Sequence, residues 1–394
     1  MNRSAGKKLV IFTVLLALLI KLALFAYTSF LCPEGKIELD SRAYLKTAGF
    51  LADHGTFGWI SDGNILIFET FRTPGYPLFL ALFHHLWHVP LAGIIFLQIL
   101  LTAGAAYLTC RAAAFIHPRL GLLSGLLILL DPPTTILSLM LLTESLFLFL
   151  LTAFLYCMGT YLKNPGLRRL ILSALLLVMC TYVRPVTFYL GVFVAFFVAA
   201  SGFRSEWKRA VTHALIFALL VYGLLGIWQW RNYRRTGTLS FSTIVMATLH
   251  PEMGTGLVPS YEQFVAEKNP SPGEKIRFVV SGTTDSVLSL MTDPGTLKYF
   301  KSQPLTIAGK VVGYPFMIFW MTGFLAGIPA GRNNKFFAFY LFLIGYFVAV
   351  TVGGTFLGAC ARFRIPMMPL IAVFAAQGWL TIRDFLENKR NPAT

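Results

Sequence analysis

Long apolar runs separated by short polar segments dominate the sequence. Such runs are long enough to cross a hydrocarbon core of about 30 Å. A chain in lipid must also satisfy its own backbone hydrogen bonds, which favours helices. The pattern therefore predicts an all-α polytopic membrane protein with about ten transmembrane spans. The predicted spans are residues 9–31, 91–110, 119–134, 143–162, 169–185, 187–201, 210–229, 306–325, 335–353 and 366–382.

One apolar run, residues 74–88, is too short to be assigned as a span by length alone. If it crossed the membrane, the basic loops further along the chain would all change sides. We therefore predict that it forms a helix lying at the outer interface, with Trp87 at headgroup level. Residues 32–90 then form one outer loop that carries two or three juxtamembrane helices, the first at about residues 41–54.

A second polar segment, rich in Gly, Pro and Ser, runs from Arg231 to about Thr306. It predicts an outer loop with short helices. No independent soluble domain is predicted, so residues 1–394 are interpreted as a single membrane domain. Its predicted parts are a first span at 9–31, an outer loop at 32–90, six spans at 91–229, an outer loop at 230–305, three spans at 306–382 and a cytoplasmic tail at 383–394.

Composition and charge agree with this scheme. The chain is 56% hydrophobic and only 13% charged, with a net charge of +16. On one side of the predicted membrane sixteen Lys and Arg accompany three Asp and Glu, whereas the other side has sixteen against fourteen. Basic residues in short loops mark the cytoplasmic side, so both termini are predicted to be cytoplasmic. The positive charge is thus explained by topology, and no nucleic-acid partner is predicted.

The N-terminus and the cysteines add little to the prediction. The first apolar run could be a signal peptide, but its length and the lack of a small-residue cleavage site favour an uncleaved span. The five cysteines show no metal-binding spacing. Cys32 and Cys360 both fall on the predicted outer side and could pair. Otherwise the cysteines are small buried apolar residues.

The first outer loop contains the chain's main candidates for chemistry. Asp40, just before Ser41, could act as a base on an acceptor hydroxyl or help to hold a metal ion. It could equally be the N-cap of the helix that begins at Ser41. Arg72 precedes the turn at residues 74–77, where a guanidinium could bind a phosphate through paired donors. The alternative is that Arg72 extends to lipid headgroups.

Further charged residues lie at the predicted outer ends of other spans. Arg184, followed by a proline, interrupts an apolar run, and an ionisable residue at such a depth is usually functional. Arg362 and Arg364 precede the last span. Glu144 begins an inward-running span, where it either stabilises the helix N-terminus or orients an arginine. Arginines that converge at one face would suit an anionic group such as a phosphate or pyrophosphate.

A metal site is compatible with the outer loop but is not specified by it. Glu69, His84 and His85 could join Asp40 around a divalent metal ion, yet nothing in their spacing indicates one. The chain also has no Walker A loop, no Rossmann glycine pattern, no Gly-x-Ser-x-Gly elbow and no His-Glu-x-x-His motif. A lipid-carried donor reached from the outer side is therefore a more natural substrate than a cytoplasmic nucleotide.

Several short motifs together resemble the GT-C glycosyltransferases. They are an acidic residue in the first outer loop, Arg-x-Pro-Gly-Tyr-Pro-Leu-Phe-Leu, Thr-Glu-Ser-Leu before an inward span, Arg-Pro at an outer hairpin, and Arg-Phe-Arg-Ile-Pro before the last span. The resemblance covers roughly residues 9–382. Within this superfamily the chain is most similar to the bacterial protein O-mannosyltransferase-like group, with the lipid A aminoarabinose transferase and the core galacturonosyltransferases as relatives.

The resemblance implies transfer of a sugar from a polyprenyl-phosphate carrier to a lipid, glycan or protein acceptor on the outer face of a bacterial inner membrane. Asp40 would be the catalytic carboxylate. The carrier phosphate would be bound by Arg72, Arg184, Arg362 and Arg364. The pocket would be lined by Tyr44, Tyr76, Glu69 and Glu144. No second acidic residue stands directly beside Asp40, which counts against a metal-dependent mechanism.

Rival functions are also compatible with the sequence. A flippase or transporter of a lipid-linked or anionic saccharide would use outer arginines to guide its substrate, but transporters usually show internal repeats and polar residues at the midplane. An O-antigen ligase-type enzyme would use outer arginines without the early Asp40 segment, and a non-catalytic assembly subunit is a further alternative. No clear repeat is present and the unusual polar residues gather at one face, which favours an enzyme.

Overall fold

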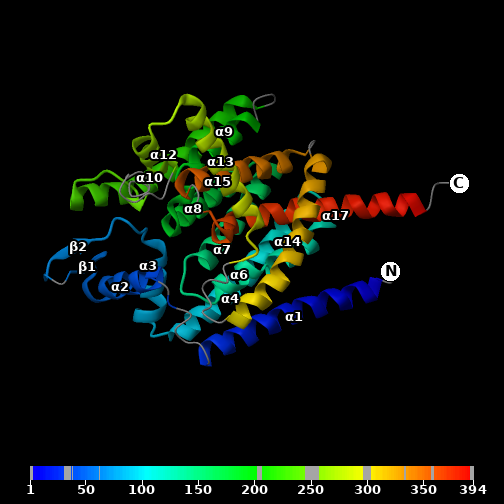
Figure 1. Cartoon of the computed structure of the whole chain (residues 1–394), viewed down its shortest axis with the longest axis horizontal. Coiled ribbons are helices and arrows are strands. Elements are labelled where there is room, and N and C mark those ends of the chain that lie inside the picture. The colour runs from blue at the N-terminus through cyan, green and yellow to red at the C-terminus, as the bar shows by residue number, and fades with distance from the viewer. Residues whose placement is uncertain are drawn as a thin grey trace.

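The computed structural model describes residues 3–30, 37, 39–61, 63–201, 206–244, 257–295, 303–331, 334–355 and 359–390. Within them the chain is mainly helical (Figure 1). The first half contains α1 (Arg3–Phe30), α2 (Leu39–His54), β1 (Gly58–Ile60), β2 (Leu66–Phe68), α3 (Gly75–Leu80), a π-helix (Ala81–Leu86), α4 (Leu91–Ala113), α5 (Leu120–Leu130), α6 (Pro132–Ser138), α7 (Glu144–Lys163) and α8 (Leu167–Val183). The second half contains a 3-10 turn (Pro185–Thr187), α9 (Leu190–Ser201), α10 (Trp207–Thr236), α12 (Leu257–Lys268), α13 (Pro272–Thr292), α14 (Gln303–Gly331), α15 (Lys335–Thr355), α16 (Ala361–Arg364), a 3-10 turn (Ile365–Met367) and α17 (Met368–Arg390).

The described residues include six helices that are long and apolar enough to cross a membrane. The count is seven if α5 and α6, which meet at an angle of 54°, form one broken span. The chain is therefore an integral membrane protein. Each predicted span lies mainly on helical residues, with residues 119–134 on the bent pair α5 and α6. α8, with 17 residues, is too short to be counted as a span, and α1 and α9 contain only the shorter apolar stretches Thr13–Tyr27 and Pro185–Ser201. The number ten stays a prediction.

The first predicted loop, residues 32–90, contains a strand hairpin in addition to the predicted helices. Helices are found where residues 41–54 and 74–88 predict them, as α2 and as α3 with the π-helix. Between them β1 and β2 form an antiparallel hairpin in which Trp59 pairs with Ile67. The hairpin adds two strands to an otherwise helical fold, and strands of three residues are too short to show a period-2 pattern in the sequence.

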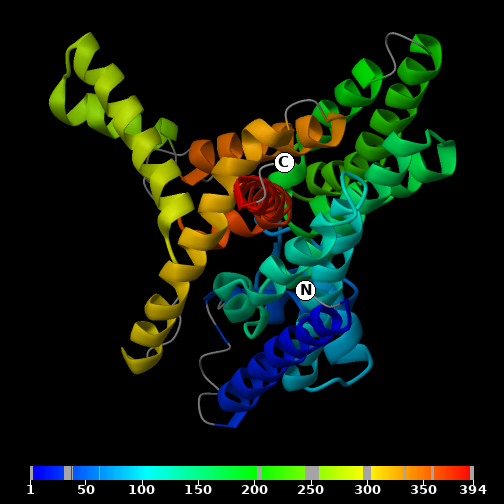
Figure 2. The same cartoon turned by 90° about the vertical axis from the view of Figure 1, so that its right-hand side faces the viewer.

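The second outer segment is more helical than its composition predicts. α10 continues through the predicted loop start to Thr236, and Gly237 then ends it in the left-handed conformation at φ 73°. α13 runs for 21 residues, which is longer than the short helices predicted there. A capping box at Ser271 and Glu274 begins α13 and supplies the start signal. Figure 2 shows α12 and α13 extending away from the body of the molecule.

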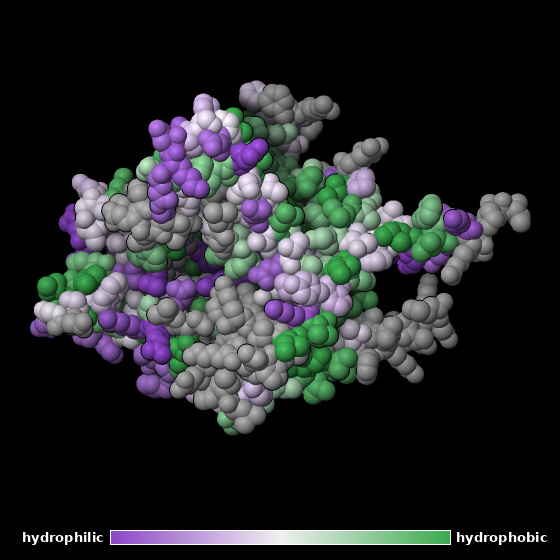
Figure 3. All heavy atoms as spheres, in the orientation of Figure 1, coloured by the Kyte–Doolittle hydropathy of each residue, from purple (hydrophilic) through white to green (hydrophobic). Residues whose placement is uncertain are grey.

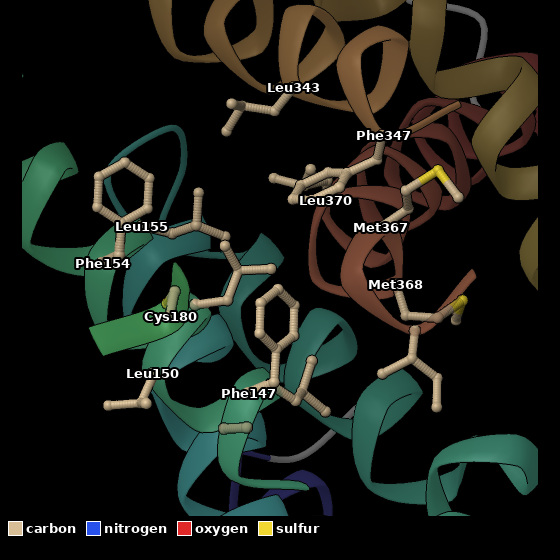
Figure 4. Packing of buried hydrophobic residues seen from close by; sticks show 14 of the residues in the cluster. Phe147, Leu150, Phe154, Leu155, Cys180, Leu343, Phe347, Met367, Met368 and Leu370 are labelled. Carbon is tan, nitrogen blue, oxygen red and sulfur yellow. The ribbon is translucent and has the colours of Figure 1, made fainter. Parts of the chain in front are cut away.

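The two ends of the bundle differ in what they carry. The N-terminal end of α1 and the C-terminal end of α17 lie at one end, whereas α2, the hairpin and α3 lie at the other (Figure 1). In the core, Phe147 and Leu155 of α7 point toward Phe347 of α15 and Leu370 of α17 (Figure 4). This packing brings α7 close to the last helix, so that the start of α7 at Glu144 meets α16, which precedes α17.

Small residues allow α14 and α17 to approach closely. A Cβ built on Gly327 would lie 2.0 Å from the carbonyl oxygen of Phe374, and one on Gly378 would fall even closer to Gly323. Only glycine fits at such a distance, as is common where membrane helices pack backbone to backbone. On the other side of the bundle, Lys21 of α1 is buried and donates a hydrogen bond of 2.7 Å to Thr135 of α6. That buried contact attaches α1 to the broken span.

Candidate functional site

Five charged side chains from distant parts of the chain meet at the end of the bundle that carries α2 and α3. We call them the carboxylate–arginine cluster: Asp40, Arg72, Glu144, Arg184 and Arg362. They come from the first turn of α2, the segment before α3, the start of α7, the end of α8 and α16. Figure 3 shows hydrophilic residues gathered along a hollow on this side of the molecule.

Asp40 is the exposed member of the cluster, with 39% of its side chain accessible. α2 begins at Leu39, so Asp40 lies in the first helical turn and is not the N-cap of a helix starting at Ser41. Its Oδ1 lies 3.4 Å from Nη2 of Arg72, and its Oδ2 lies 3.2 Å from Nη1 of Arg362. Both carboxylate oxygens are thus contacted by guanidinium groups, yet solvent still reaches the side chain.

Glu144 is the buried member, with only 2% of its side chain accessible. Its Oε1 accepts hydrogen bonds from Nε of Arg362 at 2.5 Å and from Nη1 of Arg184 at 2.8 Å. Arg184 follows the last residue of α8 in extended conformation and also lies over the ring of Phe147, 5.7 Å from its centroid. Glu144 therefore holds Arg184 and Arg362 close together, and its own carboxylate is shielded from solvent.

The segment that carries Arg72 is fixed by backbone contacts. Oε1 of Glu69 accepts hydrogen bonds from the amides of Phe71 at 2.8 Å and Arg72 at 3.0 Å. The hydroxyl of Thr73 donates to the carbonyl of Val183 at 3.0 Å. Glu69 is thus buried and fixes the turn through its backbone contacts, while its other carboxylate oxygen lies 3.6 Å from Nη1 of Arg72.

Gly75 explains why the Pro-Gly-Tyr-Pro turn has glycine at its second position. A Cβ at Gly75 would lie 2.7 Å from the carbonyl carbon and oxygen of Tyr182. The turn therefore rests directly on the last residues of α8. This close approach holds the segment that carries Arg72 against the end of α8, which Arg184 follows.

Two tyrosines form an aromatic wall beside the cluster. The rings of Tyr44 and Tyr76 meet edge to face at 5.1 Å, and the guanidinium of Arg72 lies 5.6 Å from the centroid of Tyr44. Burial, together with the nearby Asp40 and Glu144 carboxylates, raises the pKa of Tyr44 to about 12. The Tyr44 hydroxyl therefore stays protonated at physiological pH and can donate a hydrogen bond.

Sequence reasoning missed Gln98, which supports this wall. Gln98 is fully buried in α4. Its Oε1 accepts a hydrogen bond of 2.6 Å from the hydroxyl of Tyr76, and its Nε2 donates to the carbonyls of Ser138 and Met140. A lone glutamine within an apolar run is the only signal that the sequence contains for this role, and such a residue usually finds a partner inside a bundle.

Arg364 does not join the cluster, although it stands two residues from Arg362. Its side chain is buried, and Nη1 donates to the carbonyls of Leu290 at 2.8 Å and Asp293 at 3.0 Å. The guanidinium also lies 5.2 Å from the ring of Trp320. These contacts attach the C-terminal end of α13 to α16 and lend no support to a role in phosphate binding.

Other polar residues of residues 32–90 and of α10 make structural contacts of their own. Arg231 lies within α10 and donates to the carbonyls of Glu69 at 2.8 Å and Phe57 at 2.5 Å, so it braces the hairpin. His84 contacts the carbonyl of Val89 at 2.7 Å. Burial lowers the pKa of His85, and the neighbouring His84 lowers it further. The possible pairing of Cys32 with Cys360 cannot be followed, because Cys32 lies outside the described residues.

The described donors do not fit a divalent metal ion. No three His, Cys, Asp or Glu side chains among the described residues are grouped so that they could hold one. Both Asp40 oxygens face guanidinium groups, whose positive charge opposes a cation at the same place. No step of the chemistry is therefore assigned to a metal here.

Solved structures of similar fold come from the oligosaccharyltransferase of Archaeoglobus fulgidus. One is the structure of the enzyme tethered to an acceptor peptide that contains the NVT sequon. It is 14% identical to this chain with a TM-score of 0.54, and the match covers 98% of this chain and 51% of the solved chain. The structure of the complex with Zn and sulfate is 12% identical with a TM-score of 0.57, and the match covers 96% of this chain and 50% of the solved chain. The structure of the oligosaccharyltransferase AglB in complex with an inhibitory peptide and a dolichol-phosphate is 12% identical with a TM-score of 0.54, and the match covers 99% of this chain and 52% of the solved chain.

At such identities the likeness establishes the fold alone. The chain spans about half the length of the solved enzyme and is similar to that part of it in fold. No protein-family model and no curated protein matches the chain. The predicted resemblance agrees with this similarity of fold, and the assignment to the GT-C superfamily stays a prediction.

Proposed function

We propose that this chain is a membrane glycosyltransferase that transfers a sugar from a polyprenyl-phosphate carrier to an acceptor at the membrane face where α2 and α3 lie. The observation that carries the proposal is the placement of an exposed carboxylate, Asp40, against two arginines that come from different segments. The archaeal oligosaccharyltransferase of similar fold has a structure in complex with a dolichol-phosphate, which supports a lipid-phosphate donor for this chain. The acceptor would be a glycolipid, a glycan or a protein.

The arginines supply the phosphate site of this proposal. Arg72, Arg184 and Arg362 are each only partly accessible, between 15% and 21% of the side chain. A guanidinium has five N–H donors, so it can hold a carboxylate and a phosphate oxygen together. Charge that develops on the leaving phosphate would be stabilised by fixed donors of this kind, and one such donor is typically worth about 10²- to 10³-fold in rate.

The contact lengths suggest how donor binding would prepare the base. Glu144 is held at 2.5 and 2.8 Å, whereas Asp40 is held at 3.2 and 3.4 Å and is much more exposed. An incoming phosphate would therefore displace Asp40 from Arg72 and Arg362 and leave Glu144 in place. Asp40 would then be released beside the donor, ready to accept a proton.

The reaction follows from that arrangement. An acceptor hydroxyl attacks the anomeric carbon, and its proton passes to the Asp40 carboxylate. The bond from the anomeric carbon to the phosphate oxygen breaks, and the electron pair leaves with the polyprenyl phosphate. Attack from the face opposite the phosphate inverts the anomeric carbon. A positioned general base of this kind contributes about 10²- to 10⁴-fold.

The finer assignments belong to the same proposal. They are a protein O-mannosyltransferase-like, aminoarabinose transferase-like or galacturonosyltransferase-like activity, a bacterial inner membrane, cytoplasmic termini and a site on the outer face. The charge distribution between the two sides supports this orientation. A flippase remains the rival, but the ionisable cluster lies at one end of α7 and not at its middle, where transporters bind substrate.

The test is reconstitution of the full chain in liposomes with radiolabelled polyprenyl-phosphate sugars and a membrane extract as the acceptor source. The proposal expects label to leave the carrier, with release of polyprenyl phosphate. Movement of intact labelled donor across the bilayer without cleavage would establish the flippase instead. If none of the labelled donors is cleaved or moved across the bilayer, both the transferase and the flippase are excluded.

A further inference from the structure

A second polar pocket lies at the far end of α7 from the carboxylate–arginine cluster. α7 begins at Glu144 and ends at Lys163, which places the two sites about 30 Å apart along the helix. The pocket has a volume of about 320 Å³ and lies between the ends of α7, α9 and α10. Its polar lining consists of Tyr161, Lys163, Ser201, Glu206, Arg209 and His213.

Hydrogen bonds within the protein hold Arg209 and His213 of this pocket in place. Arg209 donates through Nη2 to the carbonyl of Pro165 at 2.6 Å and through Nη1 to Glu206 at 2.8 Å. The hydroxyl of Tyr161 lies 2.9 Å from Nδ1 of His213. Lys163 is exposed at the pocket rim. The Lys163 ammonium and the Arg209 guanidinium thus line one concave site with the single carboxylate of Glu206, which leaves a positive balance that suits an anion.

The wall of the pocket is apolar and continues along α9. Phe197 and Val198 line the cavity. The adjoining face of α9 exposes Tyr189, Val192, Phe193 and Phe196, at 55%, 55%, 44% and 74%. Spacings of three, four and seven residues place these side chains on one helical face. An apolar stripe that runs from an anion site along a membrane helix matches a lipid, whose headgroup and acyl chains need both.

We propose that this pocket binds the headgroup of an anionic phospholipid in the leaflet opposite the carboxylate–arginine cluster. Basic pockets between membrane helices are a known form of lipid-headgroup site. The lipid phosphate would contact Lys163 and Arg209, and an acyl chain would lie along α9. The site is independent of the proposed sugar transfer, since it shares no residue with the cluster.

The experiment measures bound lipid by native mass spectrometry of the full chain released from nanodiscs of phosphatidylcholine and phosphatidylglycerol in equal parts. The double variant Lys163→Gln, Arg209→Gln removes two pocket charges and should lower the bound phosphatidylglycerol by about tenfold to thirtyfold. The control is the double variant Arg111→Gln, Arg168→Gln. It also removes two charges, but these arginines are exposed and do not line the pocket. It should retain the lipid.

Two further measurements distinguish a lipid site from a loss of folding and from a site for a soluble anion. Lys163→Gln alone leaves the contact of Arg209 with Pro165 intact and should lower bound lipid by about fivefold with an unchanged Tm. Soluble glycerol phosphate should compete poorly, because it has no acyl chain for α9. Three results would each overturn the lipid site. They are an equal loss of bound phosphatidylglycerol in the control, full retention of bound phosphatidylglycerol in the double variant, and competition by glycerol phosphate as strong as that by phosphatidylglycerol.

Discussion

Nη1 of Arg362 lies 3.2 Å from Oδ2 of Asp40, although 322 positions separate the two residues in the chain. The same guanidinium donates through Nε to the buried Glu144. One arginine therefore joins an exposed carboxylate to a hidden one. This arrangement divides the two acids by role, because a substrate can reach only the exposed one.

Removing the charge of Asp40 tests the proposed base. Asp40→Asn should lower kcat by about 10²- to 10⁴-fold, since a neutral amide cannot accept the acceptor's proton. Affinity for polyprenyl phosphate should stay the same or rise, because the carboxylate that competes for Arg72 and Arg362 is gone. Transfer rates and equilibrium binding of polyprenyl phosphate measure the two effects separately.

Asp53→Asn is the matched control, because Asp53 is exposed at the other end of α2. It should leave both quantities unchanged. Full transfer by Asp40→Asn would exclude the catalytic role. Weaker donor binding in that variant would contradict the exchange of Asp40 for phosphate.

Arg72 should act on donor binding. Arg72→Ala removes a guanidinium from the phosphate site and should lower kcat/KM for the donor by about 10²- to 10³-fold. Arg72→Lys should recover part of the loss, because it keeps the charge without the paired donors. Titration of the rate against donor concentration distinguishes these variants from the exposed control Arg119→Ala. An unchanged KM would favour the alternative that Arg72 merely contacts lipid headgroups.

Glu144 should matter to both stability and rate. Glu144→Gln leaves Arg184 partly buried without its anion and leaves Arg362 with Asp40 alone, which should lower the free energy of unfolding by about 3 kcal/mol. Arg184 and Arg362 would also lose their fixed positions, so kcat should fall. Unfolding in detergent, followed alongside transfer assays, reports both changes.

The exposed pair of Arg383 and Asp384, 2.6 Å apart, supplies a contrast to Glu144. Asp384→Asn breaks a solvent-exposed ion pair and should cost less than about 1 kcal/mol. A Glu144→Gln variant as stable as Asp384→Asn would show that the buried carboxylate does not hold the arginines.

The close contact of α14 with α17 predicts a steric effect. Gly327→Ala would place a methyl group 2.0 Å from the carbonyl oxygen of Phe374, so the helices must separate. Overpacking of this kind costs about 1 to 3 kcal/mol. Gly345→Ala is the control, because no atom lies within 4 Å of its added Cβ. Thermal unfolding should separate the two variants, and equal stability would argue against the tight helix pair.

Much of the helical framework could be predicted from the sequence, because apolar runs in a membrane protein have few alternatives to helices. The break at Arg184 and Pro185 is visible in the chain, as is the turn at Gly75. Local signals also located α2. The hairpin and the full length of α13 escaped prediction, since short strands and a mixed polar helix lack a strong period.

What the sequence determined by itself was the class of protein, the order of its helices and the end at which the unusual charges gather. Which charges meet was decided only by the tertiary structure. Residues two apart on a helix point about 200° away from each other, so Arg362 faces Asp40 whereas Arg364 turns toward α13. No local pattern indicates which of the two faces the cluster, because that depends on the packing of the last helix against α7 and α13.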